Sequence, residues 1–225
     1  FDGFGTPAQI KAFFTVLDRA FPRRIGRRRR IIPETSVFTH KKFRLLPYPG
    51  YQTIWLDLTK DTEILKRELK PQWRNKLGKA ARAGLEAQWD ETGESLPWLL
   101  TKYQSDKAKK EYEGPSPQLL TRLAEVFAPR GRLLIGKARL GEKVIAAVFV
   151  LCHGAGATYQ VGWSSEEGRH VAAHNFLLWQ TVCHLKDKGI KDFDLGGIND
   201  EKAHGVRDFK EGMGGETVSC AGRYL

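Results

Sequence analysis

The chain has 225 residues, a length that suits one large domain, or one domain and part of a second. A hydrophobic fraction of 41% favours a folded protein, no apolar run approaches the roughly 20 residues that span a bilayer, and residues 1–22 do not have the pattern of a secretory signal peptide. The 37 basic residues against 26 acidic ones leave a net charge of +11, which favours a polyanionic partner.

The basic charge is concentrated at the N-terminal end. Residues 1–44 contain 11 Lys and Arg and 3 Asp and Glu, which gives that segment +8, and the densest run is Arg27–Arg30. Three interpretations are open: a solvated surface, a contact with RNA phosphates that weakens with salt, and an anionic membrane surface. The chain begins with Phe1 rather than Met, which is consistent with a trimmed or processed fragment. Residues 8–20 predict a short amphipathic helix that begins after a Thr-Pro pair, because proline is favourable in the first turn.

A strand and a helix are predicted next along the chain. Residues 51–58 alternate in polarity, as half-buried strands do. Thr59 or Asp61 is then expected to cap a helix that ends near Leu69. Pro71 interrupts that helix or begins the next one, since proline lacks the N–H that a helix interior requires.

The following helix contains the sequence WRNKLGKA and has one apolar face. Four residues at helical spacing define this face: Trp73, Leu77, Ala80 and Ala81. Gly84 stands where a C-terminal cap is expected. A strand over residues 85–89 comes next, followed by helices near 94–105 and 117–128.

An antiparallel sheet is predicted in the second half of the chain. Residues 132–140 and 143–151 flank Gly141-Glu142, which is the signature of a hairpin. Residues 157–163 then form a third strand in succession.

A long helix over residues 170–188, ending at Gly189, completes the regular pattern before a short buried strand at 191–197. The stretch GVRDFKEGMGG is interpreted as a loop and residues 217–225 as a last strand. The three cysteines are scattered and the histidines lack ligand spacing, so neither a disulfide framework nor a metal site is inferred. The predicted fold class is α/β (α+β), with a mixed, mostly antiparallel sheet flanked by helices.

Three motifs occur in a fixed order: LDL followed by WRNKLGKA, GATYQVGW followed by the long helix, and FDLGGIN followed by GVRDFKEGMGGE. Their order and spacing resemble the FemABX family, whose members have two domains related to the GNAT acetyltransferase fold. The FDLGGIN and FKEGMGG pair is the most specific part. The resemblance implies a GNAT-like transferase domain over residues 51–225, corresponding to the family's second domain. Residues 1–50 are then a basic N-terminal segment, interpreted as the remnant of a first such domain.

The resemblance also implies a reaction. FemABX proteins take an amino acid from aminoacyl-tRNA and attach it to an amine of a peptidoglycan stem peptide, or to a related peptide. The expected partners are therefore aminoacyl-tRNA, as a co-substrate in place of a bound cofactor, and a peptidoglycan precursor or other peptide amine. The expected location is the cytoplasm, with peripheral contact at the inner face of the membrane.

The same resemblance assigns roles to individual residues. Lys210 corresponds to the family lysine beside the acyl ester, where a positive charge steadies the oxyanion of the tetrahedral intermediate. Phe209 is expected to pack against the terminal adenosine or the acyl group, because aromatic faces stack on bases. Tyr159 is expected to contact substrate from its strand. The alternatives without a functional role are that Phe209 and Tyr159 belong to the core and that Lys210 is a surface charge.

Lys107, Tyr112 and Arg74 complete the predicted substrate-binding set. In DKAKKEYEG the family pattern of an Arg followed by a Tyr is replaced by Lys107 and Tyr112. A lysine can hold phosphate as a point charge but loses the bidentate fork of arginine, so the identity of the precursor is open. Arg74 lies in the WRNKLGKA motif and is included with them.

Asp194, Gly196 and Gly197 are predicted to shape the exit of the FDLGG strand, because glycine permits close backbone approach. Asn199 and Asp200 are expected to cap the next segment. His174, on the long helix, is interpreted as an interior histidine whose hydrogen bonds are satisfied, rather than as a catalytic base.

Two other functions are open. An acyl-CoA-dependent N-acyltransferase of the same fold would hold a pyrophosphate on a glycine-rich loop at a helix start. The corresponding stretch, SSEEGRHVAAHNF, lacks the usual glycines and carries Glu166 and Glu167, so CoA is less favoured. A non-catalytic RNA-binding module on a transferase fold is the third possibility.

Overall fold

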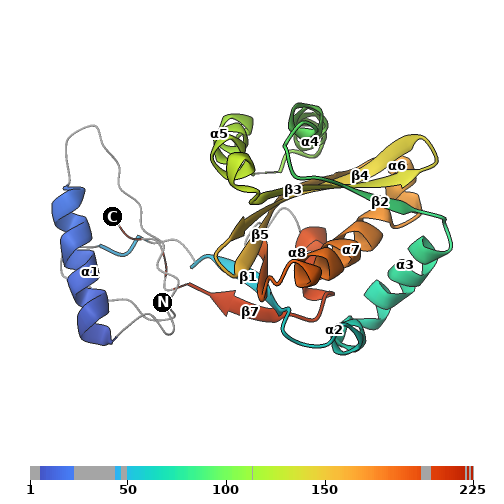
Figure 1. Ribbon diagram of the computed structural model, residues 1–225. Helices are drawn as coiled ribbons and strands as arrows, with labels where there is room; N and C mark the ends of the chain where they lie inside the picture. The colour runs from blue at the N-terminus through green and yellow to red at the C-terminus, as the bar shows by residue number, and fades with distance from the viewer. Residues whose placement is uncertain are drawn as a thin grey trace. The chain divides into compact units, whose positions relative to one another are not determined.

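The computed structural model describes most of the chain (Figure 1). The described residues are 6–22, 44–46, 50–112, 114–198, 204–220, 222 and 224. The basic run Arg27–Arg30 and the proposed capping residues Asn199 and Asp200 lie outside them. The chain divides into two compact units, the larger formed by Ile54–Gly196 with Asp200–Glu216 and the smaller by the remaining segments.

The smaller unit contains helix α1, Pro7–Ala20, which confirms the helix predicted over residues 8–20. Thr6 accepts a hydrogen bond from the backbone N–H of Gln9, and the Gln9 side chain accepts one from the backbone N–H of Thr6. This reciprocal pairing satisfies two N–H groups that have no partner inside the helix. The C-terminal residues of the chain also belong to this unit, where Leu45 and Tyr224 form an antiparallel bridge.

Seven strands form one mixed sheet in the order β2-β3-β4-β5-β6-β1-β7, which confirms the predicted fold class. The strands are β1 (Gln52–Asp57), β2 (Glu86–Asp90), β3 (Leu133–Leu140), β4 (Lys143–His153), β5 (Gly156–Ser164), β6 (Asp192–Gly197) and β7 (Glu216–Ser219). Strands β2 to β5 pair antiparallel in succession, whereas β5 and β6 pair in parallel. The last strand is shorter than predicted from residues 217–225.

Helices cover both faces of this sheet in the larger unit. They are α2 (Thr62–Glu68), α3 (Pro71–Ala81), α4 (Leu96–Lys110), α5 (Pro117–Phe127), α6 (Glu166–His170), α7 (Ala173–Asp187) and α8 (His204–Glu211). Helices α4 and α5 lie on one face, and α3 and α7 on the other (Figure 1). Among the described residues, no helix has the length and apolar character that crossing a membrane requires.

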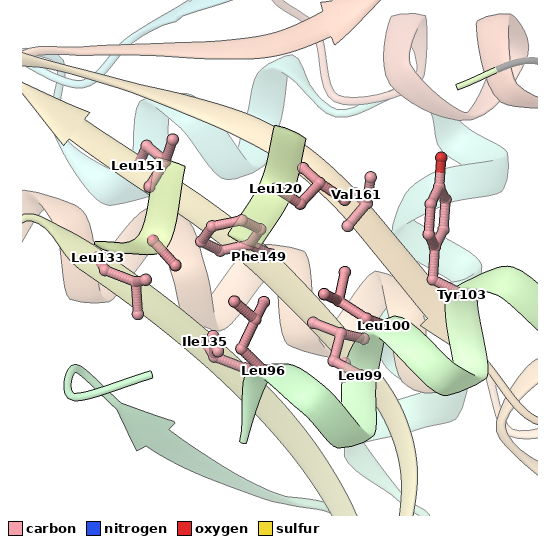
Figure 2. Packing of buried hydrophobic residues seen from close by; sticks show 12 residues of the cluster. Leu96, Leu99, Leu100, Tyr103, Leu120, Leu133, Ile135, Phe149, Leu151 and Val161 are labelled. Carbon is pink, nitrogen blue, oxygen red and sulfur yellow. The ribbon is translucent and has the colours of Figure 1, made fainter. Parts of the chain in front are cut away.

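The face of the sheet beneath α4 and α5 carries a continuous apolar cluster (Figure 2). Leu96, Leu99 and Leu100 from α4 and Leu120 from α5 pack there with Phe149 of β4. All eight residues from 145 to 152 are buried, because β4 lies in the middle of the sheet with helices on both sides. Central strands covered on both faces read as unbroken apolar runs, which explains the sequence IAAVFVLC.

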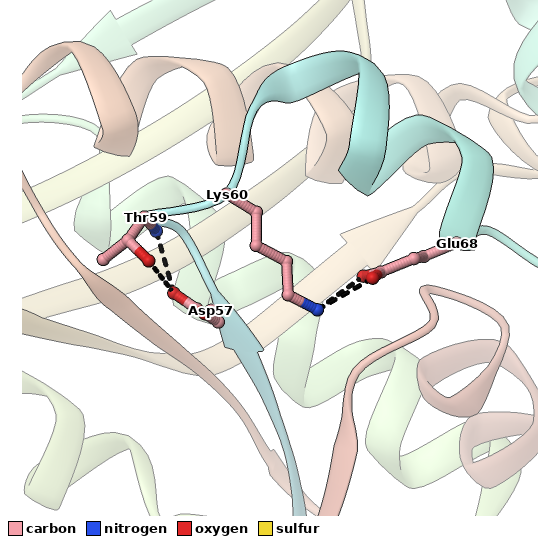
Figure 3. A network of polar contacts seen from close by, with 4 residues as sticks. All are labelled: Asp57, Thr59, Lys60 and Glu68. Atoms are coloured by element: carbon pink, nitrogen blue, oxygen red, sulfur yellow. Dashed lines mark hydrogen bonds and ion pairs between the residues drawn. The ribbon is translucent and has the colours of Figure 1, made fainter.

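The turn between β1 and α2 differs from its prediction. Asp61 occupies the N-cap position of α2, but its side chain makes no capping hydrogen bond. Thr59 instead donates from its backbone N–H and its hydroxyl to Asp57 Oδ1, at 2.9 and 2.5 Å (Figure 3). Lys60 donates to both carboxylate oxygens of Glu68 at 2.8 and 3.0 Å (Figure 3). The aspartate before the turn therefore takes the hydroxyl that was expected to cap the helix.

The helix predicted over residues 170–188 is confirmed as α7, although it begins at Ala173, after Ala172, which adopts a left-handed conformation with φ of 56°. One further prediction was wrong. The stretch GVRDFKEGMGG, interpreted as a loop, contains helix α8. In α3, Trp73 and Ala80 are buried as predicted, but Ala81 is exposed at the last turn.

Helix α5 offers a matched test of the core. Leu120 is fully buried in the cluster, whereas its neighbour Leu119 is 51% exposed. Replacing Leu120 by Ala should lower the free energy of unfolding by about 2–5 kcal/mol, since the cavity adds to the lost apolar burial. Leu119→Ala should change it by no more than about 0.5 kcal/mol. Urea unfolding of both variants measures the difference, and equal effects would contradict the packing described.

Candidate functional site

The parallel strands β5 and β6 pair over a short stretch. Their register covers Gly156 with Asp192, Ala157 with Phe193, and Thr158 with Asp194, and ends there. On its other edge, β5 pairs with β4 and carries a bulge. Val150 pairs with Tyr159, but the preceding residue, Phe149, pairs with Val161. The site begins at this point on β5.

The bulge leaves Gln160 as an extra residue, so Tyr159 and Gly162 come to lie on the same face of the strand. The tyrosine side chain lies along the strand, and a Cβ added at Gly162 would stand 2.2 Å from its hydroxyl oxygen. The hydroxyl oxygen of Tyr159 lies 3.2 Å from Nε2 of His174, which is in the first turn of α7. The glycine therefore provides the space in which the tyrosine and the histidine meet.

Lys210 extends from α8 to the same place. Its side chain is only 7% exposed, and its ammonium lies 5.6 Å from the centre of the Tyr159 ring. Burial lowers the pKa of Lys210 to about 8, although the charge of Asp194 works in the opposite direction. An ammonium over an aromatic face is attracted by the negative face of the ring, and the attraction is stronger when water is excluded. The lysine therefore presents a weakly hydrated positive charge.

Helix α8 is anchored by the start of α3. The indole N–H of Trp73 donates to the carbonyl oxygen of Phe209 at 3.1 Å, and the two rings are 5.9 Å apart. The backbone N–H of Lys70 donates to the carbonyl of Gly212 at 2.9 Å. The Phe209 ring also lies 5.4 Å from that of His174. The WRNK and FKEG motifs thus contact each other and hold the lysine in place.

The glycines of the two specific motifs permit close approach of backbone. A Cβ at Gly214, where φ is 80°, would stand 2.2 Å from the carbonyl oxygen of Glu68, and one at Gly215 would stand 2.4 Å from that of Trp55. At Gly196, with φ of 74°, a Cβ would stand 2.9 Å from the Tyr159 carbonyl oxygen. The backbone N–H of Gly196 donates to Asp194 Oδ1 at 2.7 Å. Gly196 therefore lies against Tyr159 and Lys210, and the other two glycines let the chain after α8 pass against α2 and β1.

Tyr112 belongs to the surroundings of the site. Burial is the first cause of the raised pKa of Tyr159, and the nearby hydroxyls of Tyr112 and Tyr103 raise it further. The Tyr103 and Tyr112 rings lie 6.2 Å apart, and Tyr103 donates to the carbonyl oxygen of Pro115 at 3.1 Å. Lys107 donates to the carbonyl of Gly114 at 2.8 Å, so it closes the loop that carries Tyr112.

Two of the predicted residues lie elsewhere. Arg74 donates to the carbonyl oxygens of Arg67 and Leu69 at 2.8 and 2.5 Å, so it satisfies the C-terminal end of α2. Gly197 belongs to the smaller unit, where a Cβ would stand 2.9 Å from the ring of Tyr51. The structure brings together Lys210, Phe209 and Tyr159 with Asp194 and Gly196, and their substrate roles stay predictions.

Residues 68–211, well over half of the chain, match the family described as the acetyltransferase (GNAT) domain. The chain belongs to this family. It therefore carries an acyltransferase domain of the GNAT type, and the parallel strands β5 and β6 lie with Lys210 and Tyr159 inside the matched region.

Solved structures extend this likeness beyond the matched GNAT region. The crystal structure of FemX superimposes with a TM-score of 0.73 over 87% of this chain and 70% of its own, at 13% identity. The C-terminal DUF2156 domain of an Agrobacterium fabrum protein described as a lysylphosphatidylglycerol synthetase gives 0.55 over 80% and 60%, at 19% identity. L-PGS from Bacillus licheniformis gives 0.51 over 81% and 60%, at 12% identity. These likenesses show the fold, and the chain spans about three fifths of the last two structures. No curated protein matches the chain significantly.

Within this GNAT domain, the sequence interpretation missed two features. The contact of His174 with Tyr159 joins residues separated by the β5–α6 connection, and no local pattern indicates it. Helix α8 did leave a signal, because Phe209 and Lys210 follow Val206 at spacings of three and four.

The environment of Lys210 makes a direct prediction. Its Nζ should titrate near pH 8, against an ordinary lysine value of 10.5, because burial disfavours the charged form. Asp194→Asn keeps an oxygen for the N–H of Gly196 but removes a negative charge, so it should lower this pKa further. NMR of side-chain-labelled lysine, assigned with Lys210→Met, measures both values. Titration of Lys210 above pH 10 in the unaltered chain would contradict the burial.

Proposed function

We propose that this acyltransferase moves an aminoacyl group from aminoacyl-tRNA to the amine of a peptidoglycan precursor stem peptide or a related peptide. The acceptor nitrogen attacks the carbonyl carbon of the ester and a C–N bond forms. The C–O bond to the terminal ribose breaks, and the proton that the amine loses passes to the ribose oxygen, which leaves as a hydroxyl. The ester is already activated, so the reaction needs alignment of the two substrates and stabilisation of the oxyanion. Because charged tRNA is the donor, we expect the reaction in the cytoplasm.

The observation that carries the proposal is the buried ammonium of Lys210 beside Tyr159 of β5. Because this positive charge is already desolvated, little solvent has to reorganise around it when negative charge develops on the carbonyl oxygen. With a pKa of about 8, most of this lysine is protonated at pH 7. It therefore suits electrostatic stabilisation of an oxyanion better than proton abstraction.

The surroundings support an RNA donor and a peptide acceptor. Phe209 keeps partial exposure beside Lys210, so its ring can stack on the terminal adenosine. The net charge of +11 favours a polyanionic donor and predicts that transfer weakens with salt. The loop of Lys107 and Tyr112 is the proposed contact for the acceptor.

A second candidate is an acyl-CoA-dependent N-acyltransferase, which the match to the acetyltransferase (GNAT) domain favours. A CoA pyrophosphate would be expected at the start of the helical segment after β5. There, Ser165 caps α6 and Glu166 and Glu167 occupy its first turn. Two carboxylates beside a pyrophosphate are unfavourable, so aminoacyl-tRNA is the donor we prefer.

Neutralising Lys210 tests the proposed mechanism. Lys210→Met keeps a side chain of similar length and should lower transfer about 10²–10³-fold, the usual effect of removing an oxyanion donor. The assay supplies total tRNA charged with radiolabelled amino acids and a wall-precursor extract. The control is Arg207→Met on the same helix, whose exposed guanidinium pairs with Glu211 and should be dispensable for transfer. Transfer by Lys210→Met at the unaltered rate would rule out this role.

The pH dependence separates the two roles that Lys210 could have. If the ammonium stabilises the oxyanion, transfer falls as pH rises through about 8, where Lys210 loses its proton. If the neutral amine acted as a base, transfer would rise over the same range. The measurement is the ratio of the transfer rate of the unaltered chain to that of Lys210→Met from pH 6 to 10. Ionisation of the acceptor amine changes both rates equally, so its effect cancels in this ratio. A rising ratio would refute the oxyanion role.

Titration calorimetry with acetyl-CoA distinguishes the donors. We expect no binding at micromolar concentrations, because of the carboxylates at the start of α6. Micromolar binding, with acetyl transfer to an amine, would favour the second candidate. Binding of charged tRNA without transfer to any acceptor would instead indicate a non-catalytic RNA-binding module.

A further inference from the structure

The hydrogen-bonded pair of Tyr159 and His174 is not used by the oxyanion mechanism. The phenol oxygen and Nε2 of the imidazole are 3.2 Å apart, and the rings meet at 72°. Both residues are half-buried. The pair also occupies a built space, since a Cβ at Gly162 would stand 2.2 Å from the phenol oxygen and 2.5 Å from Cε1 of the imidazole.

Charged groups from two helices and a backbone group from β5 face this pair. Burial lowers the pKa of His174 to about 4, the backbone of Trp163 on β5 opposes the shift, and Lys110 of α4 and Lys210 of α8 lower it further. Burial also raises the pKa of Tyr159, with Tyr112 and Tyr103 acting in the same direction. Near neutral pH the site therefore holds a neutral imidazole and an un-ionised phenol.

We propose that His174 is a positioning residue that turns the hydroxyl hydrogen of Tyr159 towards itself, so that the phenol oxygen accepts a hydrogen bond from the acceptor amine. In the tautomer with its proton on Nδ1, the imidazole accepts from the phenol through Nε2. The phenol oxygen then offers only lone pairs to the substrate. An amine that donates one N–H to this oxygen has its own lone pair free for the carbonyl carbon. This inference rests on the proposed function and identifies the group that aligns the nucleophile.

Lys210 adds a selection to this arrangement. Its ammonium lies 5.6 Å from the ring of Tyr159 and repels a second cation bound at the phenol oxygen. The acceptor is therefore taken as the neutral amine, which is the nucleophilic form. The same lysine that stabilises the oxyanion thus disfavours the unreactive ammonium form of the acceptor.

Three variants at position 174 test whether an acceptor atom is needed. His174→Gln retains an oxygen that can accept from Tyr159 and should keep kcat within about five-fold. His174→Phe fills a similar volume without an acceptor and should lower kcat about 10–100-fold, with a smaller change in KM, because alignment rather than binding is lost. His174→Lys supplies only donors and should be at least as impaired as His174→Phe. Equal activity of the Gln and Phe variants would overturn the proposal, since a purely structural role would favour Phe.

A double-variant comparison shows whether His174 acts through the tyrosine. In the Tyr159→Phe background, His174→Gln and His174→Phe should transfer at the same rate, because no hydroxyl remains to be oriented. A further ten-fold loss for His174→Phe in that background would overturn the proposal.

A readout independent of activity uses nitrogen NMR of labelled histidine, assigned with His174→Gln. At pH 7 the Nε2 of His174 should be unprotonated, and a protonated Nε2 would overturn the inference. Complete absence of transfer by the unaltered chain would refute the proposed function, and this inference with it. Normal transfer by His174→Phe, with Lys210→Met impaired, would refute only this inference.

Discussion

The desolvated ammonium of Lys210 is the constraint on which the site depends. Lys210 is the one buried charged side chain among the residues that the structure describes. Burial lowers its pKa from the ordinary lysine value of 10.5 to about 8. A shift of this size corresponds to a cost of about 3 kcal/mol for keeping the charge at that position. The fold offsets the cost with the ring of Tyr159 and the carboxylate of Asp194. Such a group lowers the stability of the fold but is well suited to stabilise a developing negative charge.

The rest of the larger unit holds that charge in position. The pairing of β5 with β6 covers three residue pairs, and the bulge on β5 brings Tyr159 and Gly162 to the same face. Trp73 of α3 holds the backbone of α8, and the glycines after Lys210 allow the chain to pass against α2 and β1. The motifs that indicated the family therefore act mainly through backbone packing, and that packing places Phe209 and Lys210.

Most elements of the fold could be predicted because their periodicity is local, as in the hairpin at Gly141-Glu142 and the apolar run of β4. The start of α7 at Ala173 could not, since alanine is the best helix former and yet Ala172 adopts a left-handed conformation. Lys210 and Phe209 were identified through a family motif. The pairing of Tyr159 with His174 depends on a bulge and on Gly162, and neither the bulge nor the contact has a signature in the sequence.

The most direct test of the account compares two stable analogues of the reacting ester by calorimetry, with the unaltered chain and with Lys210→Met. One is an amide-linked aminoacyl-adenosine, which resembles the ground state, and the other is an anionic phosphonate, which resembles the tetrahedral intermediate. A charge that acts on the oxyanion predicts that the substitution weakens the phosphonate about 100-fold and the amide only slightly, because catalysis requires stronger binding of the transition state than of the substrate. Equal weakening of both analogues, or of neither, would contradict the central role of Lys210.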